Sequence, residues 1–221
     1  MKRFLLTAVL AAMSLCSFAQ GYELSIEGMG SVGPIRCSNS YAGINILNGY
    51  RIPWGTGLFV GVGSGMVATS YLTDFKRVEY VDAPTEFDIT REKGNFFVPV
   101  YGSLQYYLTK NKMKQFYARL DVGYEFAVFR FDSDRKLFDK TGQEHGMYVE
   151  PSIGYNIRLK GMDKSRSVYF TLGPTFQRCV FNRTVVKELS EMNEDGYTGT
   201  ATTVKHNWLL PSIALRVGWR L

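Results

Sequence analysis

The stretch that decides the fold is residues 207–221, which read NWLLPSIALRVGWRL and end the chain. With a period of two residues, its side chains separate into two faces. The apolar face holds Leu209, Pro211, Ile213, Leu215, Val217, Trp219 and Leu221, and the other holds Trp208, Leu210, Ser212, Ala214, Arg216, Gly218 and Arg220. In a soluble domain such a terminal strand would be an adhesive edge, whereas a transmembrane barrel needs a last strand that pairs with its first. The stretch therefore predicts the closing strand of such a barrel.

The same alternation recurs in seven earlier stretches. They are residues 22–32, 41–52, 57–71, 95–109, 115–131, 146–159 and 167–182. The connections between them are alternately long and short, and both termini fall at the end with the short turns. This plan predicts an all-β, eight-stranded antiparallel up-and-down transmembrane barrel with long extracellular loops and short periplasmic turns.

Local irregularities are expected at two kinds of position. Leu47 and Asn48 interrupt the alternation of their strand, which predicts a bulge there. Pro99, Pro151 and Pro211 each remove a ladder hydrogen bond near the extracellular end, which predicts bulges or bends. Because Pro99 has the opposite parity to the other two prolines, the facing of residues 95–109 stays open.

The N-terminus has the features of an export signal. Lys2 and Arg3 precede the apolar stretch FLLTAVLAAMSLC, and Ser17 and Ala19 are small residues suited to cleavage before Gln20. We expect a signal peptide over residues 1–19, a barrel domain over residues 20–221 and a location in the outer membrane. Removing Lys2 and Arg3 lowers the formal charge from +6 to +4, and the bases form no nucleic-acid patch.

Charged residues on the polar faces predict which side of the barrel faces inward. These faces carry five acids, Glu23, Glu27, Asp121, Glu125 and Glu150, and five bases, Arg51, Arg119, Arg158, Arg216 and Arg220. Charges inside a narrow eight-stranded barrel must pair, because an unpaired buried ion costs several kcal/mol. A secreted soluble barrel with an apolar interior is the rival, and its surface charges need not balance. The balance favours a lumen of ion pairs and an apolar outside.

Aromatic residues on the apolar faces predict two belts at the membrane interfaces. The belt at the short-turn end is expected to hold Tyr22, Trp54, Tyr106, Phe116, Tyr155, Phe170 and Trp219. The belt at the long-loop end is expected to hold Tyr41, Tyr71, Phe96, Phe131 and Phe181.

The chain resembles the small outer-membrane β-barrel family of Bacteroidota, which shares its architecture with OmpA, OmpX and PorT-like barrels. The resemblance rests on SFAQ at 17–20, VPVYGSLQYYL at 98–108, EPSIGYNIRL at 150–159, LGPTF at 172–176 and LPSIALRVGWRL at 210–221. It implies the fold, and it implies that outward Leu215, Val217, Trp219 and Leu221 suit insertion by the barrel-assembly machinery. These loose motifs imply no activity.

We expect a structural or interaction role through the extracellular loops, not a pore, with no cofactor and no metal. Arg130 and Arg178 interrupt the lipid face near its outer end, where they either snorkel or contact lipopolysaccharide phosphates. The loops offer a surface for an unidentified protein partner. Cys37 and Cys179 leave a disulfide open.

Catalysis is the alternative, as a lipid A deacylase or acyltransferase, alongside a role as a secretion-system accessory barrel. Such an enzyme needs a Ser–His pair with a carboxylate in reach. The chain has two histidines, His145 and His206, and neither is followed by a serine two residues later. We therefore expect no catalytic residues.

Overall fold

The computed structural model describes residues 21–33, 39–52, 57–79, 85–108, 114–130, 146–158, 166–193 and 196–221. Within these residues it contains no helix that is long and apolar enough to span a membrane. The expected signal peptide, residues 1–19, lies outside the described part of the chain.

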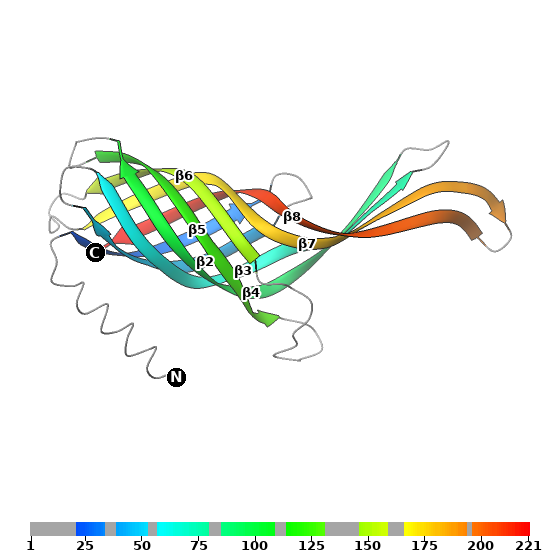
Figure 1. Ribbon diagram of the computed structural model, residues 1–221, viewed down its shortest axis with the longest axis horizontal. Coiled ribbons are helices and arrows are strands. Elements are labelled where there is room, and N and C mark those ends of the chain that lie inside the picture. The colour runs from blue at the N-terminus through cyan, green and yellow to red at the C-terminus, as the bar shows by residue number, and fades with distance from the viewer. Residues whose placement is uncertain are drawn as a thin grey trace.

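The described residues form eight strands in a closed barrel, each antiparallel to its sequence neighbours (Figure 1). The strands are β1 (Tyr22–Val32), β2 (Ser40–Arg51), β3 (Leu58–Glu79), β4 (Glu86–Tyr107), β5 (Lys114–Arg130), β6 (Gly146–Arg158), β7 (Ser167–Asn193) and β8 (Gly196–Arg220). β8 closes the barrel on β1, from Ser25 opposite Arg220 to Val32 opposite Ile213. The predicted strand number, order and closure are confirmed.

The barrel has two different ends. The C-terminus lies at one end, and the β3–β4 and β7–β8 hairpins project from the other (Figure 1). We call these the short-turn end and the hairpin end.

The structure overturns one expected irregularity and settles the facing that was left open. Leu47, Asn48 and Gly49 pair without a register shift on both sides, so the predicted bulge at Asn48 is wrong. Leu47 is buried in the lumen, where it packs with aromatic rings, and this is why an apolar residue stands at an inward position. Pro99 points inward and is buried, which settles the facing of β4 as the alternation of its apolar residues predicts.

Of the three strand prolines, Pro99 and Pro211 pair in register with Glu125 and Phe176, and Pro151 lies in an interrupted ladder. A register shift separates Phe96 from Phe97, close to Pro99. Between β6 and β7 the pairing pauses from Val149 to Ile153, a gap that contains Pro151. A proline has no N–H to donate, so it weakens a ladder where it stands.

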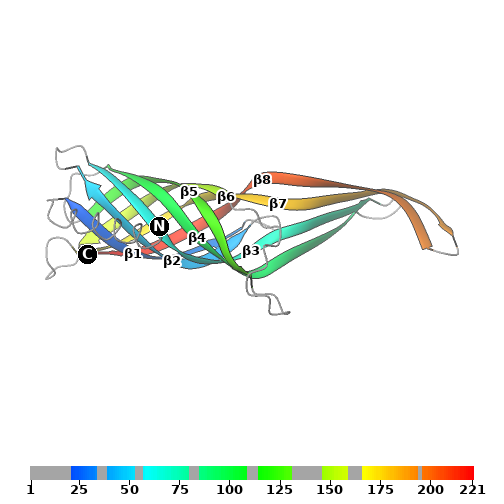
Figure 2. The ribbon, with the colours of Figure 1, turned by 60° about the horizontal axis from the view of Figure 1, so that its bottom comes forward.

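The largest difference from the sequence prediction concerns two of the long connections. Residues 72–94 and 183–206, expected to be loops, are mostly strand, because β3, β4, β7 and β8 continue beyond the barrel. The outer parts of β3 and β7 pair in parallel, from Asp74 opposite Asn182 to Glu79 opposite Lys187. The two hairpins thus form one four-stranded sheet in the order β4-β3-β7-β8, which we call the projecting sheet (Figure 2).

Candidate functional site

The lumen is polar and filled. The inward positions of the barrel hold buried charged, amide and hydroxyl side chains, whereas most of the exposed large apolar side chains lie on the outside of the wall. This arrangement is the reverse of a soluble barrel, and it suits a wall surrounded by lipid.

Five of the predicted lumen charges meet at the centre of the barrel. This central cluster consists of Glu27, Arg119, Asp121, Glu150 and Arg216, all buried. Arg216 Nη2 lies 2.6 Å from Glu150 Oε2 and 3.4 Å from Asp121 Oδ2, and its Nη1 lies 3.1 Å from Glu27 Oε2. Arg119 joins Glu27 to Asp121, with Nη2 2.8 Å from Asp121 Oδ2. The two guanidinium groups therefore link three carboxylates that belong to three different strands, β1, β5 and β6.

Hydroxyl groups donate further hydrogen bonds to these carboxylates. Tyr101 and Tyr169 donate to Glu27, and Tyr41 donates to Glu150 Oε2 over 3.2 Å. Thr175 Oγ1 donates to the same Glu150 oxygen over 2.9 Å. A buried carboxylate needs such donors once water is excluded, because its desolvation is costly.

A second group lies toward the short-turn end and consists of Glu23, Arg51 and Arg220, which we call the lower cluster. Glu23 forms ion pairs with both arginines: its Oε1 lies 2.6 Å from Arg51 Nε, and its Oε2 lies 3.1 Å from Arg220 Nε. Arg220 Nη1 also donates to Tyr107 Oη over 2.6 Å. The central cluster contains three acids and two bases, and the lower cluster contains one acid and two bases. The formal charges of the two clusters therefore cancel.

The remaining two predicted lumen charges are not part of this ionic network. Glu125 accepts a hydrogen bond from Gln177 Nε2 at 3.0 Å. Arg158, at the short-turn end, is half-exposed and lies opposite Ser167 in the β6–β7 ladder. No ion pair joins either residue to another residue of the described chain, so the prediction of five complete pairs is wrong for these two. Both lie nearer an end of the barrel than the central cluster does.

Aromatic rings fill the rest of the lumen and lie against glycines of the next strand. Tyr169 lies opposite Gly218, and a Cβ built on Gly218 would overlap its ring. Gly63 opposite Tyr101 and Gly154 opposite Tyr117 repeat the arrangement. A glycine at these inward positions leaves the space that an eight-stranded barrel otherwise lacks.

These tyrosines were missed by the sequence reasoning, which assigned roles to charges alone. A signal existed, because tyrosines on the polar faces coincide in register with glycines on the polar faces of neighbouring strands. Without the register, however, the pairs are not visible.

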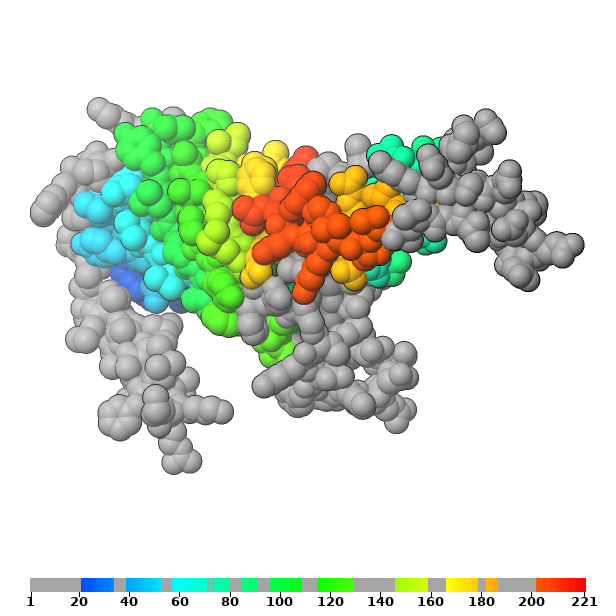
Figure 3. Space-filling view, turned by 45° about the vertical axis from the view of Figure 1, so that its right-hand side comes forward, coloured from blue at the N-terminus to red at the C-terminus, as the bar shows by residue number. Residues whose placement is uncertain are grey.

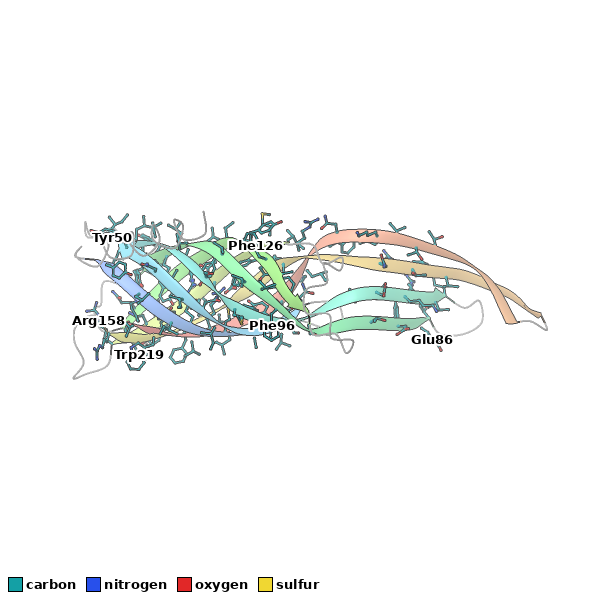
Figure 4. The ribbon with its side chains drawn as sticks, turned by 90° about the horizontal axis from the view of Figure 1, so that it is seen from below. Tyr50, Glu86, Phe96, Phe126, Arg158 and Trp219 are labelled. Carbon is teal, nitrogen blue, oxygen red and sulfur yellow. The ribbon has the colours of Figure 1, made fainter. Side chains whose placement is uncertain are left out.

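Outward aromatic residues form the belt predicted at the short-turn end. Tyr22, Tyr106, Phe116, Tyr155, Phe170 and Trp219 are at least partly exposed there, together with Tyr50. The rings of Phe116 and Tyr155 lie 4.6 Å apart. Figure 4 shows Tyr50 and Trp219 at this end and Phe96 and Phe126 toward the hairpin end. Trp54 lies outside the described residues.

The belt expected at the hairpin end is partly wrong. Tyr41 points into the lumen, where its hydroxyl donates a hydrogen bond to Glu150, so its ring does not lie at the membrane interface. Phe96 is outward and half-buried, and Tyr124 and Phe126 join it on the outer surface. The side chains of Tyr71, Phe131 and Phe181 lie outside the described part.

The residues expected to guide insertion all lie on the outer surface of β8. Leu215, Val217, Trp219 and Leu221 are exposed, and they alternate with buried inward Arg216, Gly218 and Arg220.

The projecting sheet has two unlike faces. Its lumen-side face continues the inward positions of β7 and β8 and carries Phe87, Phe75, Ile89, Arg77, Arg183, Val185 and Val204. Phe75 and Ile89 pack on Leu72 and Leu210 at the mouth of the barrel, and the Phe75 and Phe87 rings are 5.9 Å apart. Phe87 and Val204 remain 52% and 49% exposed. The outer-side face carries mainly polar residues, among them Lys76, Asp88, Thr184 and Thr203.

The two arginines expected on the lipid face lie in strands at the hairpin end. Arg178 points outward in β7, and its Nε donates to Asn207 Oδ1 over 2.9 Å. Arg130 ends β5 opposite Asn95, and its side chain is outside the described part.

The remaining candidate residues give little chemistry. His206 lies in β8 with its ring 5.3 Å from that of Trp208. His145, Cys37 and the side chain of Cys179 lie outside the described part, so the disulfide stays open. No group of three or more metal-ligating side chains occurs among the described residues.

Comparison with known proteins gives similarity in structure alone. No protein-family profile and no curated protein sequence matches the chain. The N-terminal β-barrel domain of Pseudomonas aeruginosa OprF matches with 13% identity and a TM-score of 0.41, covering 91% of this chain and 100% of that one.

Two further solved structures are similar to the chain. A major outer membrane protein from Thermus thermophilus matches with 11% identity and a TM-score of 0.41, covering 91% of this chain and 100% of that one. The β domain of the Bordetella autotransporter BrkA matches with 10% identity and a TM-score of 0.35, covering 90% and 98%. These weak similarities carry no argument about function, and the fold is established by the strand pairing itself: the chain is a closed eight-stranded antiparallel barrel.

Proposed function

We propose that this protein is an outer-membrane anchor that presents a rigid β-sheet outside the cell for binding another macromolecule. The observation that carries the proposal is the projecting sheet, whose lumen-side face keeps Phe87 and Val204 half-exposed above the filled barrel. Exposed aromatic and aliphatic groups on a rigid element are typical of binding surfaces.

The location of the sheet follows from the orientation of the barrel. Outer-membrane barrels keep their termini and short turns on the periplasmic side, so the hairpin end is the extracellular one. The predicted signal peptide and the resemblance to small outer-membrane barrels of Bacteroidota support this orientation. The barrel-assembly machinery is then the partner for insertion, and the aromatic belt marks the periplasmic interface.

Four-stranded pairing makes the projecting sheet a more suitable binding platform than two separate loops. An isolated hairpin is marginal in water, whereas a sheet of three or more strands with an apolar face meets the requirement for a stable sheet. Here the base is the contact of Phe75 and Ile89 with Leu72 and Leu210. A preformed platform loses little conformational entropy on binding.

Site-specific crosslinking in intact cells tests the proposal. A photoreactive residue at Phe87, on the lumen-side face, is expected to crosslink to a second macromolecule. The matched control is the adjacent Asp88, whose side chain lies on the opposite face of β4. Equal crosslinking at both positions, or none at either, would contradict binding through the lumen-side face.

Arg178 and Arg130 are proposed contacts for lipopolysaccharide phosphates. Arg178 points outward at the hairpin end beside Asn207, at the level where such headgroups lie. The Arg130→Ala/Arg178→Ala variant is expected to retain less lipopolysaccharide through purification, measured by phosphate and fatty-acid analysis. Unchanged retention would leave both arginines as snorkelling side chains.

Lipid modification and a role as a secretion accessory are the alternatives. No contact among the described residues favours either of them over binding.

A further inference from the structure

Two arginines lie on the lumen-side face of the projecting sheet, in adjoining strands. Arg77 of β3 lies opposite Val185, and Arg183 of β7 lies opposite Phe75. The two arginines are therefore one strand and two residues apart, which places their Cα atoms about 8 Å from each other. Figure 3 shows orange residues of β7 and teal residues of β3 together in the part of the molecule that projects from the barrel. The face thus carries two neighbouring cations.

These two arginines share one carboxylate. Arg77 Nη2 lies 2.8 Å from Glu79 Oε1, and no other acid occupies a described position of this face. Arg183 forms no ion pair with another residue of the described chain. The Nε–H groups of both arginines are buried and have no acceptor among the described residues. The site therefore keeps capacity for an anion, because a guanidinium has several N–H donors and does not lose its charge.

Exposed apolar side chains lie beside each arginine. Phe87 of β4 lies opposite Arg77, and Val204 of β8 lies opposite Arg183. Both apolar side chains are half-exposed. A guanidinium is more weakly hydrated than an ammonium group, so an arginine among apolar side chains loses its water at modest cost when a partner covers it. Arginine and aromatic residues together are enriched at protein interfaces.

Glu79 restricts the chemistry of the ligand. A nucleic acid or an acidic polysaccharide repeats its negative charge, so some of its charges would lie beside Glu79, where like charges repel. A folded protein presents single charges among apolar side chains. It can therefore place a carboxylate at Arg183 and apolar groups at Phe87 and Val204. The pattern of this face favours a protein partner over a polyanion.

We propose that the lumen-side face binds a protein whose surface carries an aspartate or glutamate side chain next to apolar side chains. The partner's carboxylate accepts hydrogen bonds from the Arg183 guanidinium, because Arg77 already contacts Glu79. Apolar side chains of the partner cover Phe87 and Val204. The proposal rests on the proposed function and specifies the chemistry of its partner.

Carbodiimide coupling in intact cells tests for the partner's carboxylate. Arg183→Lys keeps the positive charge and supplies a primary amine, which a carbodiimide joins to a carboxylate in direct contact as an amide. We expect an adduct in which mass spectrometry finds an aspartate or glutamate of another protein bonded to position 183. Thr184→Lys is the matched control, because its side chain lies on the outer-side face. Its adduct should be at most about a tenth as abundant, since no bound carboxylate is held beside it.

Several outcomes of the coupling would overturn the proposal. These are equal adducts at positions 183 and 184, a bond only to Glu79 of the same chain, and a polysaccharide in place of the peptide. Absence of any adduct at position 183, while a photoreactive residue at Phe87 still crosslinks, would do the same. A shift in gel mobility on boiling verifies that each variant is folded.

Removal of the guanidinium gives a second test. A photoreactive residue at Phe87 is combined with Arg183→Ala or with Asn182→Ala, whose side chain lies on the outer-side face. Arg183→Ala is expected to lower the crosslinking yield at least about tenfold, because it leaves the partner's carboxylate unpaired at the interface. Asn182→Ala should retain the yield. Equal crosslinking in both variants would overturn the recognition of a carboxylate and leave the proposed function in place, whereas no crosslinking at Phe87 in any background would contradict both.

Discussion

Arg216 connects three strands of the interior, because its guanidinium contacts the carboxylates of Glu27, Asp121 and Glu150. Removing one partner of a buried ionic group leaves the others uncompensated in a medium that does not solvate them. The stability of the wall therefore depends on a residue of the last strand.

Arg216→Ala is expected to lower the free energy of unfolding by about 3–5 kcal/mol, since three buried carboxylates lose a cation. Urea titration followed by the heat-dependent gel shift measures the change. Glu125→Gln is the matched control and should cost far less, because a glutamine carbonyl still accepts the N–H of Gln177. An Arg216→Ala variant that unfolds at the wild-type urea concentration would disprove the structural role of the central cluster.

Glycines inside the barrel are expected to respond differently from glycines outside it. Gly218→Ala places a methyl group in the ring of Tyr169 and should cost about 1–3 kcal/mol of stability. Gly102→Ala on the outer surface meets nothing closer than 3.9 Å and should change stability by less than about 0.5 kcal/mol. The same unfolding titration compares the two, and equal losses would contradict the packing of tyrosine on glycine.

At the scale of elements, the barrel strands were predictable because alternate residues face the polar lumen and the lipid, and these two surroundings favour polar and apolar side chains respectively. The same reasoning failed above the barrel. The alternation there is weaker, because charged residues such as Arg77 and Arg183 share the lumen-side face with apolar ones, so these stretches resemble a loop in the sequence. Leu47 and Tyr41 show a further limit. The period of two places both side chains inward, but the apolar character of Leu47 suggested a bulge and the aromatic ring of Tyr41 suggested a place in the membrane belt.

The parallel contact between β3 and β7 is the least predictable element, because Val78 and Val186 are far apart in sequence and nothing in either strand specifies the other. Introducing cysteines at Val78 and Val186, with Cys37 and Cys179 replaced by serine, should give a disulfide in the folded protein, since paired strand positions lie within bridging distance. A mobility shift under non-reducing conditions detects it.

The control pair for this disulfide combines Glu86→Cys with Val186→Cys. These positions lie at the same level of the sheet but two strands apart, because Val78 stands between them. They should not form a bridge. If they crosslink as readily as Val78 and Val186, the order β4-β3-β7-β8 is wrong.

At the scale of the whole molecule, buried side chains occupy the lumen of the barrel. The central cluster and the lower cluster neutralise each other, and tyrosine rings occupy the space between the strands. In a planar bilayer the folded protein is therefore expected to show no steady ion conductance. Stable channels of uniform conductance in the wild type would contradict a filled lumen. The sequence predicted the charge balance, but it did not reveal the tyrosine packing that closes the remaining space.

The pairing of β3 with β7 joins strands from opposite sides of an eight-stranded wall. Each hairpin needs only its own two strands, whereas the contact between the hairpins depends on the wall that holds β3 and β7 in place. The projecting sheet therefore requires a complete barrel wall. A barrel that lacks part of its wall is therefore expected to lack the four-stranded sheet as well.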